Sequence, residues 1–110
     1  MKYKRGDIVW VKFPFSDASA NKLRPALIIS NNIVNQTGNY LLMQITTKLR
    51  SDALSLVIEN SHYREASLIK QSELRLHKIF IINENLIESK ITSVQSGFME
   101  IVIKKLIELL

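Results

Sequence analysis

Residues 6 to 14 have the sequence GDIVWVKFP, which is typical of a short β-strand between two breaks. A glycine–aspartate turn signal comes first, and residues of β-branched and aromatic type dominate from Ile8 to Phe13. Pro14 ends the run, because proline cannot donate to a sheet ladder. Both alternating faces of the strand are largely apolar, so we expect it to be covered on both sides.

Further short segments of strand-like composition follow it. We expect them at residues 26–30, 40–46, 54–58, 67–70 and 78–82. Between them we expect polar loops at 16–23 and 47–52, a helical turn and loop at 31–39, a short helix within 60–66, and a turn with a helical piece at 83–90. These connections are too short for the crossover helices that parallel strands need. The pattern therefore favours a small, mainly β barrel over an alternating βα sheet.

The C-terminal residues change to a helical period. Apolar side chains recur with the spacing of one helix face at Val94, Phe98, Ile101, Val102, Leu106 and Leu109. The segment 92–95 (TSVQ) matches a capping box, and Ser96 is an alternative first cap. Further apolar residues widen the face beyond what one contact requires, which leaves surface either for a dimer or for burial within the chain.

Composition restricts the class of protein. The 110 residues, 46% of them hydrophobic, fit a single domain spanning 1–110. The absence of cysteine excludes disulfides and thiol chemistry. The first apolar run ends too early for a signal peptide, and no stretch reaches the ~18–20 apolar residues of a membrane span, so we expect a cytoplasmic protein without membrane contact. A net charge of +5 favours a polyanionic partner, most commonly nucleic acid.

The signatures of cofactor and metal enzymes are missing. Three scattered glycines cannot form a phosphate-cradling loop, and neither His62 nor His77 has metal-ligand spacing. The acidic residues show no pairing suited to metal or glycosidic chemistry. We therefore expect no cofactor.

Arg24-Pro25 is the most informative dipeptide. A residue before proline is pushed toward extended geometry, so Arg24 is expected at a strand entrance beside the polar loop. Its planar guanidinium fits phosphate oxygens. Thr46 and Thr47 end a predicted strand, where a hydroxyl can donate to a phosphate. Taken singly, each is more typical of a solvated cation or a strand-favouring threonine.

Their order along the chain adds a resemblance. The segments GDIVWVKFPF, KLRPALIIS and LLMQITTK, in that order, resemble the MazF/PemK family of toxins from toxin–antitoxin pairs, and the likeness extends more loosely through SLIKQSELR and KITSV. It implies an SH3-like barrel of the CcdB/MazF type with short helices and a C-terminal helix. It also implies a homodimer with a cognate antitoxin.

The activity that the resemblance implies is a metal-independent, sequence-selective endoribonuclease acting on single-stranded RNA. In such enzymes the ribose 2′-hydroxyl attacks the adjacent phosphate, giving a 2′,3′-cyclic phosphate and a 5′-hydroxyl. The family's key arginine falls on Arg24 and its key threonine on Thr46, with Thr47 at the neighbouring hydroxyl position. Basic residues expected to contact RNA are Lys22, Lys48, Arg50, Lys70 and Arg75.

One departure from the family pattern concerns the general base. Some members carry Arg-x-Asp, with the aspartate proposed as the base, where this chain has Lys70 and Ser72. The base is therefore unassigned, and two alternatives stay open. They are a nucleic-acid-binding barrel without catalysis and a gyrase-directed toxin of the CcdB type.

Overall fold

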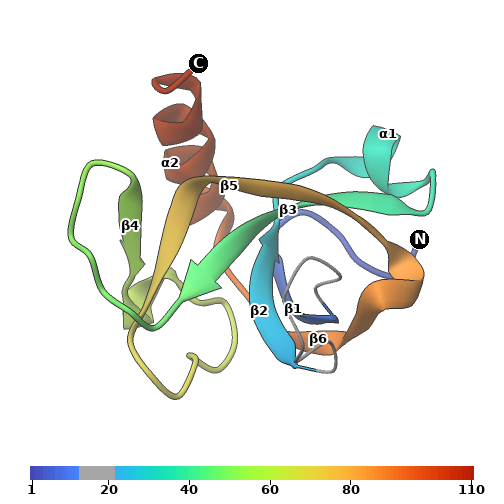
Figure 1. Cartoon of the computed structure of the whole chain (residues 1–110), viewed down its shortest axis with the longest axis horizontal. Helices are drawn as coiled ribbons and strands as arrows, with labels where there is room; N and C mark the ends of the chain where they lie inside the picture. Colours follow the sequence, from blue (N-terminus) through green and yellow to red (C-terminus); the bar gives the residue numbers. More distant parts are fainter. Residues whose placement is uncertain (13–21) are drawn as a thin grey trace.

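The computed structural model describes residues 1–12 and 22–110, and these residues form one antiparallel sheet with a terminal helix (Figure 1). The strands are β1 (Asp7–Lys12), β2 (Leu23–Ile28), β3 (Asn39–Thr46), β4 (Ser55–Ile58), β5 (Ser72–Asn83) and β6 (Ile87–Ser93). The helices are α1 (Asn32–Asn35) and α2 (Ser96–Ile107), with short 3-10 turns η1 (Asn60–His62) and η2 (Glu84–Leu86).

The strand order is β4-β5-β3-β2-β1-β6, and every strand pairing is antiparallel. This arrangement confirms the mainly β fold with a C-terminal helix. Within the described residues the edge strands β4 and β6 are not paired with each other, so the barrel is an open one. No helix among these residues combines the length and apolar character needed to span a bilayer.

The bent sheet buries apolar side chains on both faces. One cluster lies between the sheet and α2, and its buried members are Ile8, Leu27, Ile29, Met43, Ile45, Ile58, Tyr63, Leu74, Leu76, Val94, Phe98, Met99 and Val102. A second cluster lies on the other face and comprises Val9, Val11, Ala26, Ile28, Tyr40, Leu42, Ile82 and Ile87. Strand β1 contributes Val9 and Val11 to the second cluster and Ile8 to the first. Trp10 and Lys12, on the same face as Ile8, are exposed, so the expectation that both faces are covered holds on that side only at Ile8.

The second half of the sheet corrects three sequence predictions. Residues 67–70 do not form a strand, and β5 instead begins at Ser72 and runs without interruption through the strand expected at 78–82. Glu73 and Arg75 give this segment a polar appearance, yet both are buried because β5 lies between β3 and β4. The turn expected at 83–90 gives way to strand β6 at Ile87.

The start of α2 also differs from the capping prediction. Thr92 belongs to β6, and its hydroxyl donates to the Ala66 carbonyl at 2.7 Å instead of capping a helix. The helix begins at Ser96, with Gln95 as its N-cap residue and no side-chain capping bond.

Two of the sequence predictions lie outside the described residues: the end of the first strand at residues 13 and 14, and most of the loop at 16–23.

A buried tyrosine hydroxyl ties the N-terminus to the second cluster. Tyr40 is 0% exposed, and its hydroxyl oxygen accepts from the backbone N–H groups of Lys2 and Tyr3, both at 3.3 Å. The same hydroxyl donates to Glu84 Oε1 at 3.1 Å. Burial raises the pKa of Tyr40, which keeps the hydroxyl protonated and able to donate.

We expect Tyr40→Phe to lower the free energy of unfolding by about 1–3 kcal/mol, because the Tyr3 N–H loses its acceptor, while the Lys2 N–H and the Glu84 carboxylate keep only their bond to each other. Urea denaturation measures this loss. Tyr3→Phe is the matched control, since the Tyr3 backbone bond is retained. Equal stability of Tyr40→Phe and the unmodified chain would show that this hydroxyl contributes nothing.

Candidate functional site

The strand ends that carry Arg24 and Thr46 lie at the same end of the sheet, where β2 begins, β3 ends and β5 begins (Figure 1). Arg24 lies directly opposite Val11 in the β1–β2 pairing, and Thr46 lies directly opposite Glu73 in the β3–β5 pairing. The β2–β3 pairing ends at Ala26 with Gln44, and the same register continued by two residues sets Arg24 opposite Thr46. Cross-strand partners share a face of the sheet. Arg24 and Thr46 thus lie on the same side.

Arg24 is the second residue of β2 and is exposed, and no hydrogen bond or ion pair joins its side chain to another of the described residues. Pro25 follows it directly and is opposite Trp10 in the β1–β2 pairing. The proline fixes its own backbone and favours extended geometry before it. The guanidinium is therefore carried by a strand with a restricted backbone, and its donors make no bond to the described side chains.

Thr46 and Thr47 lie where β3 leaves the sheet. Thr46 is half-buried, and its Oγ1 accepts from the backbone N–H of Lys48 at 3.1 Å. This bond orients the hydroxyl oxygen but leaves the O–H free to donate. Thr47 is exposed beside it. The arrangement presents one oriented hydroxyl on the Arg24 side of the sheet.

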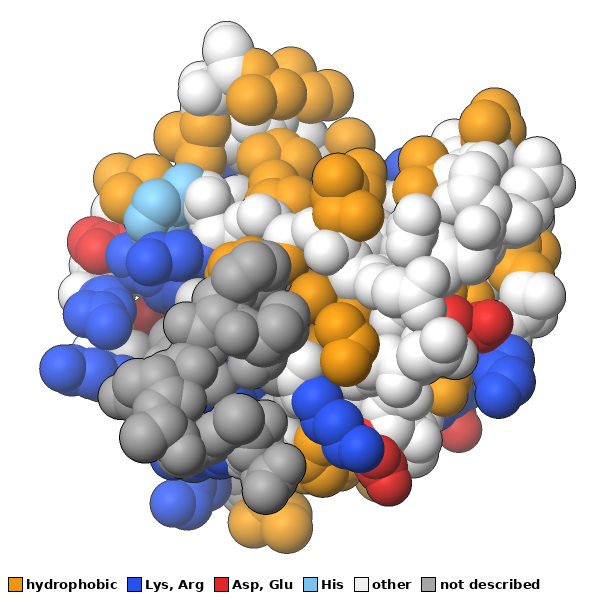
Figure 2. Space-filling model, turned by 45° about the vertical axis from the view of Figure 1, so that its right-hand side comes forward, with side chains coloured by type: hydrophobic (Ala, Val, Ile, Leu, Met, Phe, Trp, Pro, Cys, Tyr) orange, Lys and Arg blue, Asp and Glu red, His pale blue; other side chains and the backbone are white. Residues whose placement is uncertain are grey.

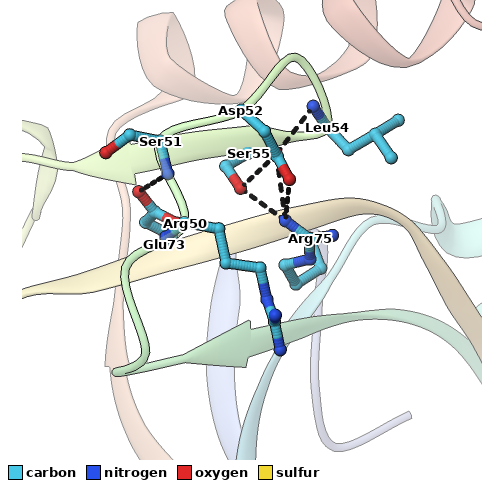
Figure 3. Close-up of polar contacts among 7 residues, drawn as sticks. All are labelled: Arg50, Ser51, Asp52, Leu54, Ser55, Glu73 and Arg75. Atoms are coloured by element: carbon cyan, nitrogen blue, oxygen red, sulfur yellow. Dashed lines mark hydrogen bonds and ion pairs between the residues drawn. The ribbon is translucent and has the colours of Figure 1, made fainter.

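A carboxylate that the sequence analysis missed faces Thr46. Glu73 is 0% exposed, and its Oε1 and Oε2 accept from the backbone N–H groups of Arg50 (2.9 Å) and Ser51 (3.3 Å) (Figure 3). A buried carboxylate is costly unless it is satisfied in this way. The available signal was a glutamate inside the alternating segment SELRL, which places its two charged residues, Glu73 and Arg75, on one face of a strand.

Arg75 is placed differently from the expected exposed phosphate contact. It is only 8% exposed, and its Nη1 donates to Asp52 Oδ1 (3.1 Å), Asp52 Oδ2 (3.3 Å) and Ser55 Oγ (2.6 Å) (Figure 3). The Ser55 hydroxyl, the Leu54 N–H and the Arg75 guanidinium lower the pKa of Asp52 despite the opposing effect of its desolvation. Arg75 thus already has a carboxylate partner.

The other predicted RNA contacts divide into two groups. Lys22, Lys48 and Arg50 are exposed and adjoin the strand ends that carry Arg24 and Thr46. Lys70 is also exposed, but it borders a separate cavity of about 300 Å³, together with Asn60 of η1 and the residues on either side of that turn. Figure 2 shows Lys and Arg side chains gathered toward one side of the face that it presents.

The histidines have no shared ligand site. His62 stacks on Phe98 with ring centroids 4.2 Å apart, and its Nδ1 accepts from the Glu59 N–H at 3.0 Å. His77 is exposed on β5. Across residues 1–12 and 22–110, no three His, Cys, Asp or Glu side chains are grouped as metal ligands.

Comparison with known proteins identifies the family. The model for the PemK-like, MazF-like toxin of type II toxin–antitoxin systems matches residues 4–110. No curated protein matches the sequence at a significant level.

Solved structures give the same fold. A MazE-MazF structure from Deinococcus radiodurans has a TM-score of 0.78 at 17% identity, covering 99% of this chain and 96% of that chain. An endoribonuclease in complex with its cognate antitoxin, from a mycobacterial species, has a TM-score of 0.75 at 17% identity, covering 96% and 92%. The Mycobacterium tuberculosis toxin MazF-mt6 has a TM-score of 0.71 at 18% identity, covering 94% and 93%. Since the family model spans nearly the whole sequence, this chain belongs to the PemK-like, MazF-like toxins of type II toxin–antitoxin systems.

Proposed function

We propose that this chain is a metal-independent, sequence-selective endoribonuclease toxin that cleaves single-stranded RNA to a 2′,3′-cyclic phosphate and a 5′-hydroxyl. The observation that carries the proposal is the position of Arg24 and Thr46 on the same side of two neighbouring strands, within a chain of this toxin family. A guanidinium and a hydroxyl in that arrangement can bind the nonbridging oxygens of one phosphodiester.

The chemistry needs charge stabilisation more than it needs a cofactor. As the 2′-hydroxyl attacks, negative charge accumulates on the nonbridging oxygens, and preorganised donors there lower the barrier. Arg24 would supply a permanent positive charge, because its guanidinium does not deprotonate in proteins. Thr46 would donate its hydroxyl to the same phosphate, and Thr47 would add a neighbouring donor.

No general base is assigned among the residues of this site. Glu73 faces Thr46, but it is fully buried and both of its oxygens accept backbone donors, so it does not reach a substrate hydroxyl. Ser72 is buried as well, with its hydroxyl donating to the Lys70 carbonyl at 2.9 Å. The proton of the attacking 2′-hydroxyl would therefore pass to water or to the substrate.

Exposed cations of the site would hold the rest of the strand. Lys22, Lys48 and Arg50 would contact phosphates on either side of the scissile bond, and Lys70 is proposed as a weaker contributor. Arg75, expected from the sequence as a further contact, is buried against Asp52 and would not touch the RNA itself. Because single-stranded RNA presents splayed bases, side chains of the same loops would contribute the sequence preference. The basic surface would also bind an acidic segment of a cognate antitoxin, and the active form would be a homodimer.

The test is incubation of the purified protein with mixed-sequence RNA in excess EDTA, followed by analysis of the product ends. We expect cleavage at a short sequence, with 2′,3′-cyclic phosphate and 5′-hydroxyl ends. Binding of RNA without cleavage would favour the non-catalytic barrel instead. DNA breaks that depend on gyrase, with RNA left intact, would favour the toxin of the CcdB type.

A further inference from the structure

The loop between β3 and β4 is anchored to β5 at two points. This loop, residues 47–54, carries Thr47, Lys48 and Arg50, three of the residues placed at the proposed RNA site. Its anchors are the side chains of Glu73 and Arg75, which are both buried and lie two residues apart on β5 (Figure 3). A loop of polar residues over a sheet end needs such anchors, because it has few apolar contacts of its own.

The Glu73 anchor binds the backbone at the middle of the loop. Its two oxygens accept from the consecutive N–H groups of Arg50 (2.9 Å) and Ser51 (3.3 Å). Ser51 has a φ of 50°, a left-handed conformation that a serine adopts only at some cost. The carboxylate therefore holds a turn that the loop sequence alone does not favour.

The Arg75 anchor binds the following part of the loop. The guanidinium pairs with the Asp52 carboxylate at 3.1 Å, and that carboxylate also accepts from the Leu54 N–H at 3.0 Å and the Ser55 hydroxyl at 2.8 Å. Charge-assisted bonds of this kind are the strongest hydrogen bonds available to a side chain. Glu73 binds the backbone N–H of Arg50 and not its side chain, so the Arg50 guanidinium takes no part in either anchor (Figure 3).

From these contacts we propose that Glu73 and Arg75 are positioning residues, which act by holding the 47–54 loop so that Lys48 and Arg50 face the strand bound at Arg24 and Thr46. This inference rests on the proposed function, because it assigns the loop to RNA binding. Neither residue touches the substrate. Their substitution should weaken RNA binding through Lys48 and Arg50 and leave the buried clusters in place.

The first experiment measures amide hydrogen exchange and needs no RNA. In Glu73→Gln one oxygen acceptor becomes an N–H₂ donor, so we expect the Arg50 and Ser51 amides to exchange at least ~10-fold faster. Core amides such as those of Leu42 should keep their protection, which shows that the variant is folded. Asp52→Asn is the second variant, and Glu100→Gln, an exposed carboxylate on α2, is the matched control.

The second experiment measures binding of a random-sequence 2′-O-methyl RNA oligonucleotide at several salt concentrations. Each phosphate contact to a single strand contributes ~0.7 to the slope of log K against log salt, so losing two contacts lowers the slope by ~1.4. We expect Glu73→Gln to approach the slope of the Lys48→Ala/Arg50→Ala double variant. When Glu73→Gln is added to that double variant, the affinity should change by less than about twofold. If Glu73 acted independently of Lys48 and Arg50, the fold-losses of affinity would multiply instead.

The outcomes separate the two levels of the proposal. The positioning role is supported if the Arg50 and Ser51 amides exchange faster in Glu73→Gln and if this substitution causes no further loss of affinity in the Lys48→Ala/Arg50→Ala double variant. Unchanged exchange at Arg50 and Ser51, or independent losses of binding, would overturn that role even if the unmodified chain binds and cleaves RNA. If the unmodified chain fails to bind the oligonucleotide, the proposed function and the RNA part of this inference both fail, whatever the exchange data show about the anchors.

Discussion

Replacing Arg24 by alanine is expected to lower the single-turnover rate constant for RNA cleavage by about 10²–10³-fold. The guanidinium would be the main source of positive charge at the phosphate, and alanine supplies neither charge nor donors. The fold should be unaffected, because Arg24 is exposed and is not part of either buried cluster. Cleavage is measured with enzyme in excess over a defined RNA, and thermal unfolding of the same preparation checks the fold.

Two further variants give this prediction its specificity. Arg24→Lys keeps the charge but loses the planar fork, so its rate should lie between those of the unmodified chain and Arg24→Ala. Lys105→Ala removes one exposed charge from α2 and should cleave at the normal rate. An Arg24→Ala protein that cleaves within about threefold of normal would remove Arg24 from the reaction, since a lost charge-stabilising donor costs far more than that.

Phe98→Ala should produce the largest loss of stability. Phe98 is 2% exposed in the cluster between the sheet and α2, and its ring stacks on His62. Removing such a ring costs about 3–5 kcal/mol, from the lost burial and the cavity that remains. Because small domains are stable by only ~5–15 kcal/mol, we expect a much lower urea midpoint and a partly unfolded population.

The matched control lies on the same helix. Ile101 is 45% exposed, so Ile101→Ala should change the free energy of unfolding by no more than about 1 kcal/mol. A difference between the two variants would assign the effect to burial of the ring against the sheet. A change in helix propensity would not explain it, because alanine is the best helix former. Similar losses in both variants would mean that α2 packs differently from the arrangement in Figure 1.

Local patterns in the sequence predicted much of this fold. The apolar run after Gly6-Asp7 forms β1, with Val9 and Val11 in one buried cluster and Ile8 in the other. The helical period after residue 94 forms α2, although the helix begins at Ser96 because Thr92 is drawn into β6. For these two elements the hydrophobic periodicity predicted whether a strand or a helix forms. The first residue of α2 was not predicted, because β6 includes residues expected to cap the helix.

The centre of the sheet was harder to predict. β5 carries Glu73 and Arg75, whose charges suggest a surface segment, and their burial is offset by partners from the 47–54 loop and by Ser55 at the start of β4. Those partners are 20 or more residues away in sequence, so no local window contains them. The two anchors could therefore be recognised only once the strands were paired.

The site was predicted unevenly for a related reason. Arg24 and Thr46 were inferred from family resemblance, and they face each other only when the β2–β3 register is continued two residues beyond its last pair, Ala26 with Gln44. Arg75 was expected among exposed RNA contacts, but its ion pair with Asp52 depends on how the loop folds back. A charged residue in a strand can be a ligand contact or an internal anchor, and only its burial and partners distinguish the two.

The most direct measurement of whether Arg24 and Thr46 act on one phosphodiester is a double-variant cycle on the single-turnover cleavage rate. Thr46→Val keeps the shape of the side chain and removes the hydroxyl. Residues that act as a unit lose activity non-additively, so Arg24→Ala/Thr46→Val should cleave within about threefold of Arg24→Ala alone. A double-variant rate reduced by the full product of the two single losses would contradict the convergence of these side chains on one scissile phosphate.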